Sequence, residues 1–159
     1  MLLAVLTDLH ANREALEACL AHAQERSADQ YAFLGDLVGY GADPAWVIDT
    51  VMAYVNRGAY VLMGNHDLGV LQDGRKDMNP NARFVVEWTR QQLDQGQLDF
   101  IRDLPMQFEI EDNLLCMPMP GHPTAGNTSM APWKRRAACE PRMPISHFAG
   151  MSTPQVCIT

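Results

Sequence analysis

The sequence predicts an α/β fold in which helices connect the strands of a parallel sheet. Three continuous apolar runs, residues 2–6, 31–34 and 59–63, are typical of strands that are buried on both faces. Between them lie two segments with apolar residues at helical spacing, each preceded by a capping signal. The order β-α-β-α-β favours parallel strands joined by right-handed crossovers.

Both predicted helices begin at residues that favour helix starts. Asn12 can cap the first helix, and Asp43 followed by Pro44 opens the second. Each helix has one apolar face that we expect to pack on the sheet. These faces are Leu16, Cys19, Leu20 and Ala23 in the first helix, and Val47, Ile48, Val51 and Tyr54 in the second.

Two further helices and a hairpin are expected after the parallel strands. Helical spacing covers residues 81–93 and 98–104. Alternating residues 107–111, a polar turn and the apolar run 114–116 predict the hairpin. The aromatic residues that we expect in the core rather than against a ligand are Trp46, Phe84 and Trp88.

Length, composition and charge indicate a single domain without a membrane segment. The chain has 159 residues, of which 47% are hydrophobic, as is ordinary for a protein with one core. No apolar run approaches the roughly 18 residues of a membrane span, and residues 1–6 are too short for a signal peptide, so we expect a cytoplasmic protein. The net charge of −7 disfavours nucleic acid as a partner. Four cysteines without CxxC spacing indicate neither a zinc knuckle nor a disulfide framework.

Polar residues follow each of the three apolar runs. Asp8 and His10 come after the first run, Asp36 after the second, and Asn65 with His66 after the third. The carboxyl ends of parallel strands open into one crevice, so we expect these side chains to converge. Carboxylate, amide and imidazole groups on rigid strand ends suit a centre of two metal ions that binds phosphate.

Each of these residues alone has a simpler interpretation. Asp8 would more often cap a helix, and Asp36 would more often belong to a turn. The string Gly64-Asn65-His66-Asp67 is different, because it should arise by chance on the order of once in a thousand chains of this length. The segment Gly39-Tyr40-Gly41 could cradle a phosphate, but it has no P-loop lysine and turn geometry is sufficient to explain it.

The strings Asp8-Leu9-His10, Gly35-Asp36 and Gly64-Asn65-His66-Asp67 resemble the signature of the calcineurin-like metallophosphoesterases. The similarity covers about the first hundred residues and is greatest to the small bacterial and archaeal phosphodiesterase-like branch. It implies an α-β-β-α sandwich, of which the second sheet is incomplete in this chain. It also implies hydrolysis of a phosphomonoester or phosphodiester by a metal-bridged hydroxide, with a small phosphorylated substrate as the partner.

The resemblance also implies a role for each site residue. Asp8 and His10 would hold the first metal, Asp36 would bridge both metals, and Asn65 would bind the second through its amide oxygen. His66 would be the general acid or a phosphate ligand. Such ligands suit Mn²⁺, Fe²⁺, Zn²⁺ or Ni²⁺ better than Ca²⁺.

The chain departs from the protein phosphatases of this family, because it lacks the GDxxDRG string. The second aspartate of that string orients the catalytic histidine, and the sequence leaves open whether Asp67 replaces it. An assignment to phosphoserine or phosphothreonine is therefore not made. The competing hypothesis is an inactive domain that binds metal, phosphate or another protein and retains part of the site.

The composition changes sharply after Cys116, which divides the chain into residues 1–116 and a tail, residues 117–159. The first part has 8 Lys and Arg against 18 Asp and Glu, whereas the tail is basic and holds 7 of the 10 prolines and 5 of the 10 methionines. Two histidine motifs that the family places in this region are missing. We expect the tail to be poorly ordered and unlike the family.

A shifted reading frame would explain this tail. Read one base earlier with permitted third codon positions, residues 150–159 can give Gly-His-Val-His-Thr-Pro-Gly-Leu-Tyr-Tyr, and residues 116–121 can give His-Ala-Asn-Ala-Trp. These strings are the missing motifs, so we predict a frameshift, with a divergent natural tail as the alternative. Unless His122 or His147 substitutes, we expect at most one metal to bind well and hydrolysis to be impaired.

Overall fold

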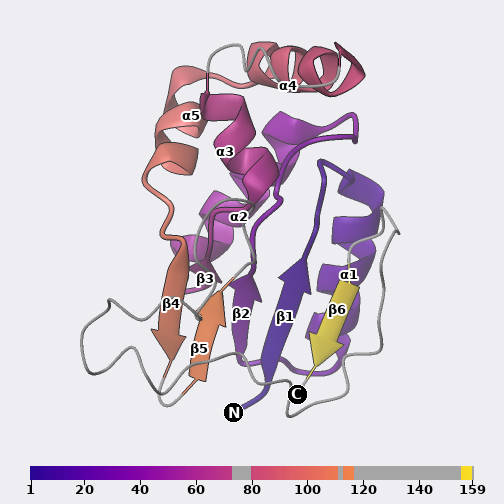
Figure 1. Ribbon diagram of the computed structural model, residues 1–159. Coiled ribbons are helices and arrows are strands. Elements are labelled where there is room, and N and C mark those ends of the chain that lie inside the picture. Colours follow the sequence, from indigo (N-terminus) through magenta and orange to yellow (C-terminus); the bar gives the residue numbers. More distant parts are fainter. Residues whose placement is uncertain (73–79, 111–112, 117–154, 159) are drawn as a thin grey trace, which may run out of the picture.

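The computed structural model of the protein describes residues 1–72, 80–110, 113–116 and 155–158. Its main sheet has four strands in the order β3-β2-β1-β6 (Figure 1). Three strands are parallel, and β6 pairs antiparallel with β1. The bounds are β1 (Leu3–Thr7), β2 (Gln30–Phe33), β3 (Tyr60–Val61) and β6 (Gln155–Ile158). The predicted parallel β-α-β-α-β unit is confirmed.

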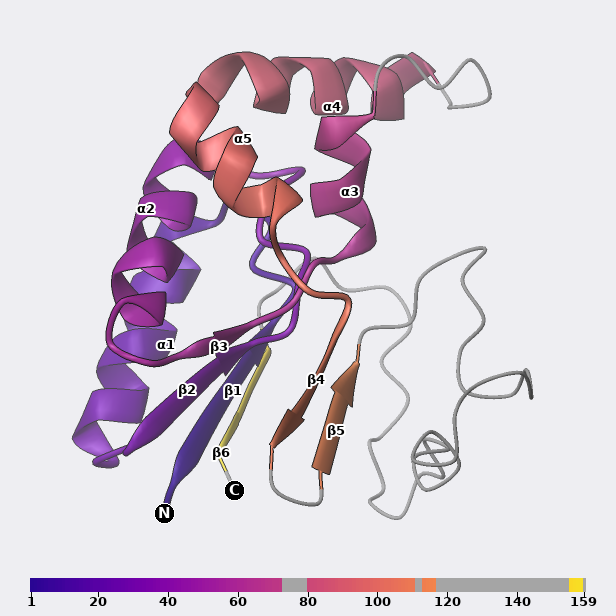
Figure 2. The ribbon, with the colours of Figure 1, turned by 90° about the vertical axis from the view of Figure 1, so that its left-hand side faces the viewer.

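Helices α1 (Arg13–Glu25) and α2 (Pro44–Val55) connect the parallel strands and cover one face of the sheet (Figure 2). Asn12 caps α1 by accepting the Ala15 N–H at 3.1 Å, and Pro44 is the first residue of α2. The predicted core faces are confirmed, with Cys19 and Tyr54 at their partly buried margins. The buried members are Leu16, Leu20 and Ala23 in α1, and Val47, Ile48 and Val51 in α2.

A hairpin lies against the opposite face of the sheet (Figure 2). Strands β4 (Gln107–Ile110) and β5 (Asn113–Cys116) pair antiparallel as predicted. The rings of Tyr60 in β3 and Phe108 in β4 contact each other, with centroids 4.7 Å apart. Helices on one side and a second small sheet on the other give the α/β layers expected for this fold class.

Three helices lie beyond the carboxyl ends of the parallel strands (Figure 1). They are α3 (Asn65–Leu71), α4 (Pro80–Gln92) and α5 (Gln95–Arg102). The sequence analysis did not predict α3. None of the helices in the described ranges is long and apolar enough to cross a bilayer.

The predicted core position of Phe84 in α4 is wrong. Phe84 is 71% exposed and Trp88 is half-buried, whereas Thr89 is fully buried and Leu93 follows it at helical spacing. The reason is that α4 packs on α3 instead of on the sheet (Figure 2), so the buried stripe is centred on Thr89 and leaves Phe84 at its exposed side. Trp46, also expected in the core, is half-buried, with the Arg13 guanidinium 4.9 Å from its ring centroid.

The tail contributes β6, where the sequence analysis expected no strand. Its backbone pairs with β1 from Ala4 opposite Ile158 to Thr7 opposite Gln155. The rest of the tail, including His122 and His147, lies outside the described residues, so the expectation that it is poorly ordered stays a prediction.

Candidate active site

Two loops at the carboxyl ends of β1 and β2 are joined by backbone hydrogen bonds. The N–H groups of His10 and Ala11 donate to the carbonyls of Asp36 and Leu37, both at 2.9 Å. The Asp8 N–H donates to the Gly35 carbonyl at 3.3 Å. These bonds hold the segment that carries Asp8 and His10 alongside the segment that carries Asp36.

The same loops contain a cluster of left-handed backbone conformations. Of the six non-glycine residues with positive φ in the described part of the chain, five lie here: Asp8, His10, Ala11, Asp36 and Tyr40. Such conformations cost of the order of 1–3 kcal/mol each and persist where the surrounding contacts impose them. The clustering of this strain at the strand ends is typical of a functional site.

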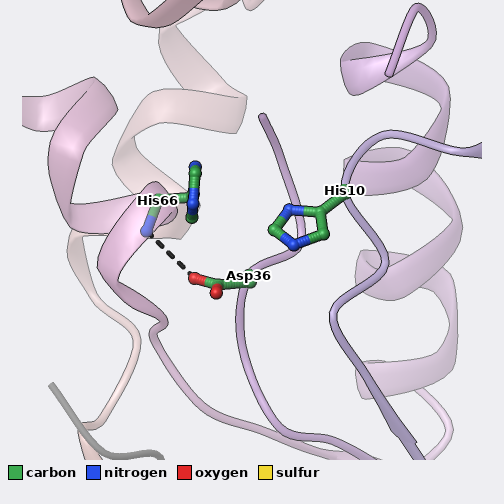
Figure 3. Close-up of side chains that lie close together, drawn as sticks. All are labelled: His10, Asp36 and His66. Atoms are coloured by element: carbon green, nitrogen blue, oxygen red, sulfur yellow. Dashed lines mark hydrogen bonds between the residues drawn. The ribbon is translucent and has the colours of Figure 1, made fainter. Parts of the chain in front are cut away.

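The third segment joins the site through α3. Helix α3 begins at Asn65, and the His66 N–H in its first turn donates to Asp36 Oδ1 at 2.9 Å (Figure 3). Gly64 immediately before it packs against the backbone of Asp36 so closely that an added Cβ would overlap that residue. The backbone at residues 64–66 is therefore fitted directly around the Asp36 carboxylate.

Through its side chain, Asp67 holds residues 64–66 next to the loop after β2. Its side chain is fully buried, and its two oxygens accept the N–H groups of Val38 at 3.1 Å and Gly64 at 2.8 Å. Burial raises the pKa of Asp67 to about 7, although the backbone hydrogen bonds lower it. The carboxylate links the loop after β2 to the start of α3.

Three side chains from the three strand ends converge. One ligand atom from each of His10, Asp36 and His66 lies within 4.8 Å of the other two (Figure 3). His10 and Asp36 are buried, and His66 is half-buried. Burial lowers the pKa of His66, against the attraction of the Asp36 carboxylate, which favours the imidazolium. The two effects oppose each other because His66 is both partly shielded from water and next to a carboxylate.

Asp8 lies at the edge of this group. Its Oδ1 is 3.8 Å from His10 Nε2, and its Oδ2 accepts a hydrogen bond from the Thr7 hydroxyl at 2.7 Å. On its other side, the His10 ring places Nδ1 3.3 Å from the Val38 carbonyl. A proton on Nδ1 would be donated to that carbonyl and would leave the Nε2 lone pair directed at the site, as in many metal-binding histidines.

The donor set of this site fits divalent transition metals. Two carboxylates and two imidazoles from Asp8, Asp36, His10 and His66 offer the mixed oxygen and nitrogen ligands that suit borderline ions. The structure also places His66, expected as the acid, within the potential ligand group. Asn65 stands directly before His66 as the first residue of α3, and its amide role stays a prediction.

One residue near these ligands was not predicted as part of the site. The Tyr40 ring contacts the rings of His10 and His66, with centroid distances of 4.8 and 4.7 Å. The sequence analysis interpreted Gly39-Tyr40-Gly41 as a turn. The only available signal was an aromatic residue between two glycines, four residues after Asp36.

The comparison with known proteins decides the family. A family model described as calcineurin-like phosphoesterase matches residues 1–145. The chain belongs to this family. Calcineurin-like phosphoesterases depend on divalent metal ions and hydrolyse phosphoester bonds, which agrees with the donor group of His10, Asp36 and His66.

Two relatives are each 33% identical to this member of the family. The chain is similar to a metallophosphoesterase from Sphaerobacter thermophilus, with 33% identity and a TM-score of 0.61 over 72% of this chain and 45% of that one. It is 33% identical over 114 residues to "Uncharacterized protein MJ0912" of Methanocaldococcus jannaschii, which is 71% of this chain and 45% of that protein.

A third relative shows the fold alone. The hypothetical protein PH1004 from Pyrococcus horikoshii is 22% identical, with a TM-score of 0.60 over 67% of this chain and 49% of that one. In all three comparisons, the chain spans about half the length of the relative.

Proposed function

We propose that this chain carries the amino-terminal part of a metal-dependent phosphoesterase site that hydrolyses small phosphomonoesters or phosphodiesters. The convergence of His10, Asp36 and His66 from three strand ends, with ligand atoms within 4.8 Å, carries the proposal. Divalent ions, when bound, would supply positive charge to phosphoryl oxygens and would lower the pKa of a water nucleophile. We favour Mn²⁺, Fe²⁺, Zn²⁺ or Ni²⁺ on the donor chemistry.

Each site residue of the chain has a candidate role in metal binding or proton transfer. Asp36 is central, because it lies between the two imidazoles and receives the His66 N–H at 2.9 Å, so it is the candidate bridging ligand. Asp8 and His10 flank it on the β1 side, and Asn65 is the candidate amide ligand on the α3 side. His66 is the candidate proton donor to the leaving oxygen: burial lowers its pKa, while the neighbouring Asp36 carboxylate favours the protonated imidazolium that would donate.

The first prediction concerns the central carboxylate. Asp36→Asn should lower the affinity of the chain for Mn²⁺ by at least tenfold, because it removes the one carboxylate charge among the three converging side chains. Calorimetric titration with MnCl₂ measures this. Asp29→Asn is the matched control, since exposed Asp29 precedes β2 at the opposite end of the strands. Equal Mn²⁺ affinity for both variants would contradict the proposed site.

A second candidate function is a domain that binds metal or phosphate without hydrolysis. It is favoured by the small set of potential ligands, His10, Asp36 and His66, that the described residues bring together. Release of p-nitrophenol from bis-p-nitrophenyl phosphate with Mn²⁺ separates the two. Metal-dependent turnover that Asp36→Asn abolishes supports the enzyme, and metal binding without turnover supports the binding domain.

A further inference from the structure

An exposed aromatic side chain contacts two of the three converging residues. Tyr40 is 63% exposed, yet its ring contacts His10 at an interplanar angle of 69° and His66 at 56°. The His10 and His66 rings also contact each other, with centroids 4.9 Å apart. One part of the Tyr40 ring therefore contacts the two imidazoles, and the rest is exposed to solvent.

The loop forces Tyr40 into this position. At Gly39, which has φ +94°, an added Cβ would lie 2.7 Å from His66 Nδ1. At Gly41, an added Cβ would overlap the carbonyl oxygens of His10 and Ala11. Only glycine fits at these two positions, because residue 39 packs against the His66 ring and residue 41 against the backbone of the β1 loop. The one side chain between them, that of Tyr40, is exposed.

Core packing does not explain this tyrosine. Its φ of +63° is a left-handed conformation that a large side chain rarely adopts, and its exposure means that it buries little area in return. An observed backbone outlier at a site, with a side chain on the reacting groups, points to a functional contact.

We propose that Tyr40 contacts the substrate and stacks on a planar group of the phosphoester, so that the site prefers a nucleotide or aryl ester to an alkyl ester. This inference rests on the proposed phosphoesterase function. A phosphate near His10, Asp36 and His66 would place its ester substituent at the mouth of the site, where the Tyr40 ring is exposed. Stacking of a base on an aromatic side chain is sequence-tolerant, because every base has a flat face.

The test compares two phosphomonoesters that differ only in the base. The Mn²⁺-loaded chain is titrated calorimetrically with adenosine 5′-monophosphate and with ribose 5-phosphate. We expect the nucleotide to bind about tenfold more tightly, as stacking of one base provides. Tyr40→Asn should reduce the preference to less than twofold, and Tyr40→Phe, which keeps the ring, should retain it. Asparagine tolerates positive φ, so this variant should fold, as circular dichroism can verify.

The outcomes separate this inference from the proposed function. If ribose 5-phosphate binds but the nucleotide has no advantage, or if Tyr40→Asn keeps the full preference, the stacking role is wrong and the phosphate site stands. If Tyr40→Asn weakens both ligands equally, Tyr40 only shields the imidazoles and the inference is overturned. If neither ligand binds in the presence of Mn²⁺, both the phosphate site and the stacking role fail for this chain.

Discussion

Single side chains hold the loops of this site together, and Asp67 does so from a fully buried position. Its oxygens accept two backbone N–H groups, one from Val38 in the loop after β2 and one from Gly64 at the start of α3. In protein phosphatases of the family, a second aspartate orients the catalytic histidine. Here the buried carboxylate instead supports the backbone segments that carry Asp36 and His66.

Removal of the Asp67 carboxylate should therefore destabilise the fold. Asp67→Ala leaves two buried N–H groups without these acceptors, which costs roughly 1–3 kcal/mol of unfolding free energy for each. Asp67→Asn should cost less, because its amide oxygen can still accept one bond. Urea denaturation of the metal-free protein measures both. Asp103→Ala is the control, since Asp103 is exposed; a midpoint as high for Asp67→Ala as for this control would refute the role.

The contribution of Tyr40 could not be recognised from the sequence, whereas Asp8, His10, Asp36, Asn65 and His66 could be chosen as candidates. The candidates stand at the ends of apolar runs in a rare combination of strings. Tyr40, in contrast, becomes a site residue only through contacts of its ring with His10 and His66. Those contacts depend on how two loops distant in sequence pack together, and no local pattern reports that.

At the scale of the elements, capping and apolar spacing predicted the helices that pack on the sheet. Both α1 and α2 begin within a residue of their capping signals. Helix α3 was missed because it has only seven residues and contains Gly69 in its interior, which weakens a helical pattern. Gly64 as a possible N-cap, with Asp67 three residues later to accept the Gly64 N–H at 2.8 Å, was the signal that could have revealed it. The burial of Phe84 in α4 was predicted wrongly because this helix packs on α3, and local spacing does not identify the element on which a helix packs.

The start of α1 provides a test at this scale. Asn12→Ala removes the side-chain oxygen that accepts the Ala15 N–H at 3.1 Å, so the free energy of unfolding should fall by about 1 kcal/mol. Thermal or urea unfolding measures the change. Asn56→Ala at the exposed carboxyl-terminal cap of α2 is the matched control and should cost less than half as much. An equal loss in both variants would mean that the Asn12 cap contributes nothing specific.

At the scale of the whole molecule, the residues that the structure describes form one sheet of four strands and a second sheet of two. The family model matches residues 1–145 and so continues beyond the boundary that composition places at residue 116. The described part of the chain brings together His10, Asp36 and His66, while the motifs expected later in the family are missing from the sequence as written. We propose that residues 117–159 come from a shifted reading frame.

Restoring the frame at the Cys116 codon should complete the centre. The restored chain would contain the His-Ala and Gly-His-Val-His strings, so we expect two metal ions for each chain instead of at most one, together with increased hydrolysis of bis-p-nitrophenyl phosphate. Mass spectrometry of bound metal and a turnover assay measure these two changes. Resequencing the gene comes first: an uninterrupted frame that encodes no Gly-His-x-His string in the shifted reading would end this proposal.

The left-handed conformations in the loops after β1 and β2 have a consequence for how an ion is captured. Asp8, His10 and Asp36 hold these conformations in loops that hydrogen bonds of the chain itself join to each other and to α3. The entropy of ordering these ligands is therefore lost during folding rather than on binding. Ion capture should proceed with little rearrangement of the backbone, so exchange of water on the ion, rather than motion of the protein, should set its rate.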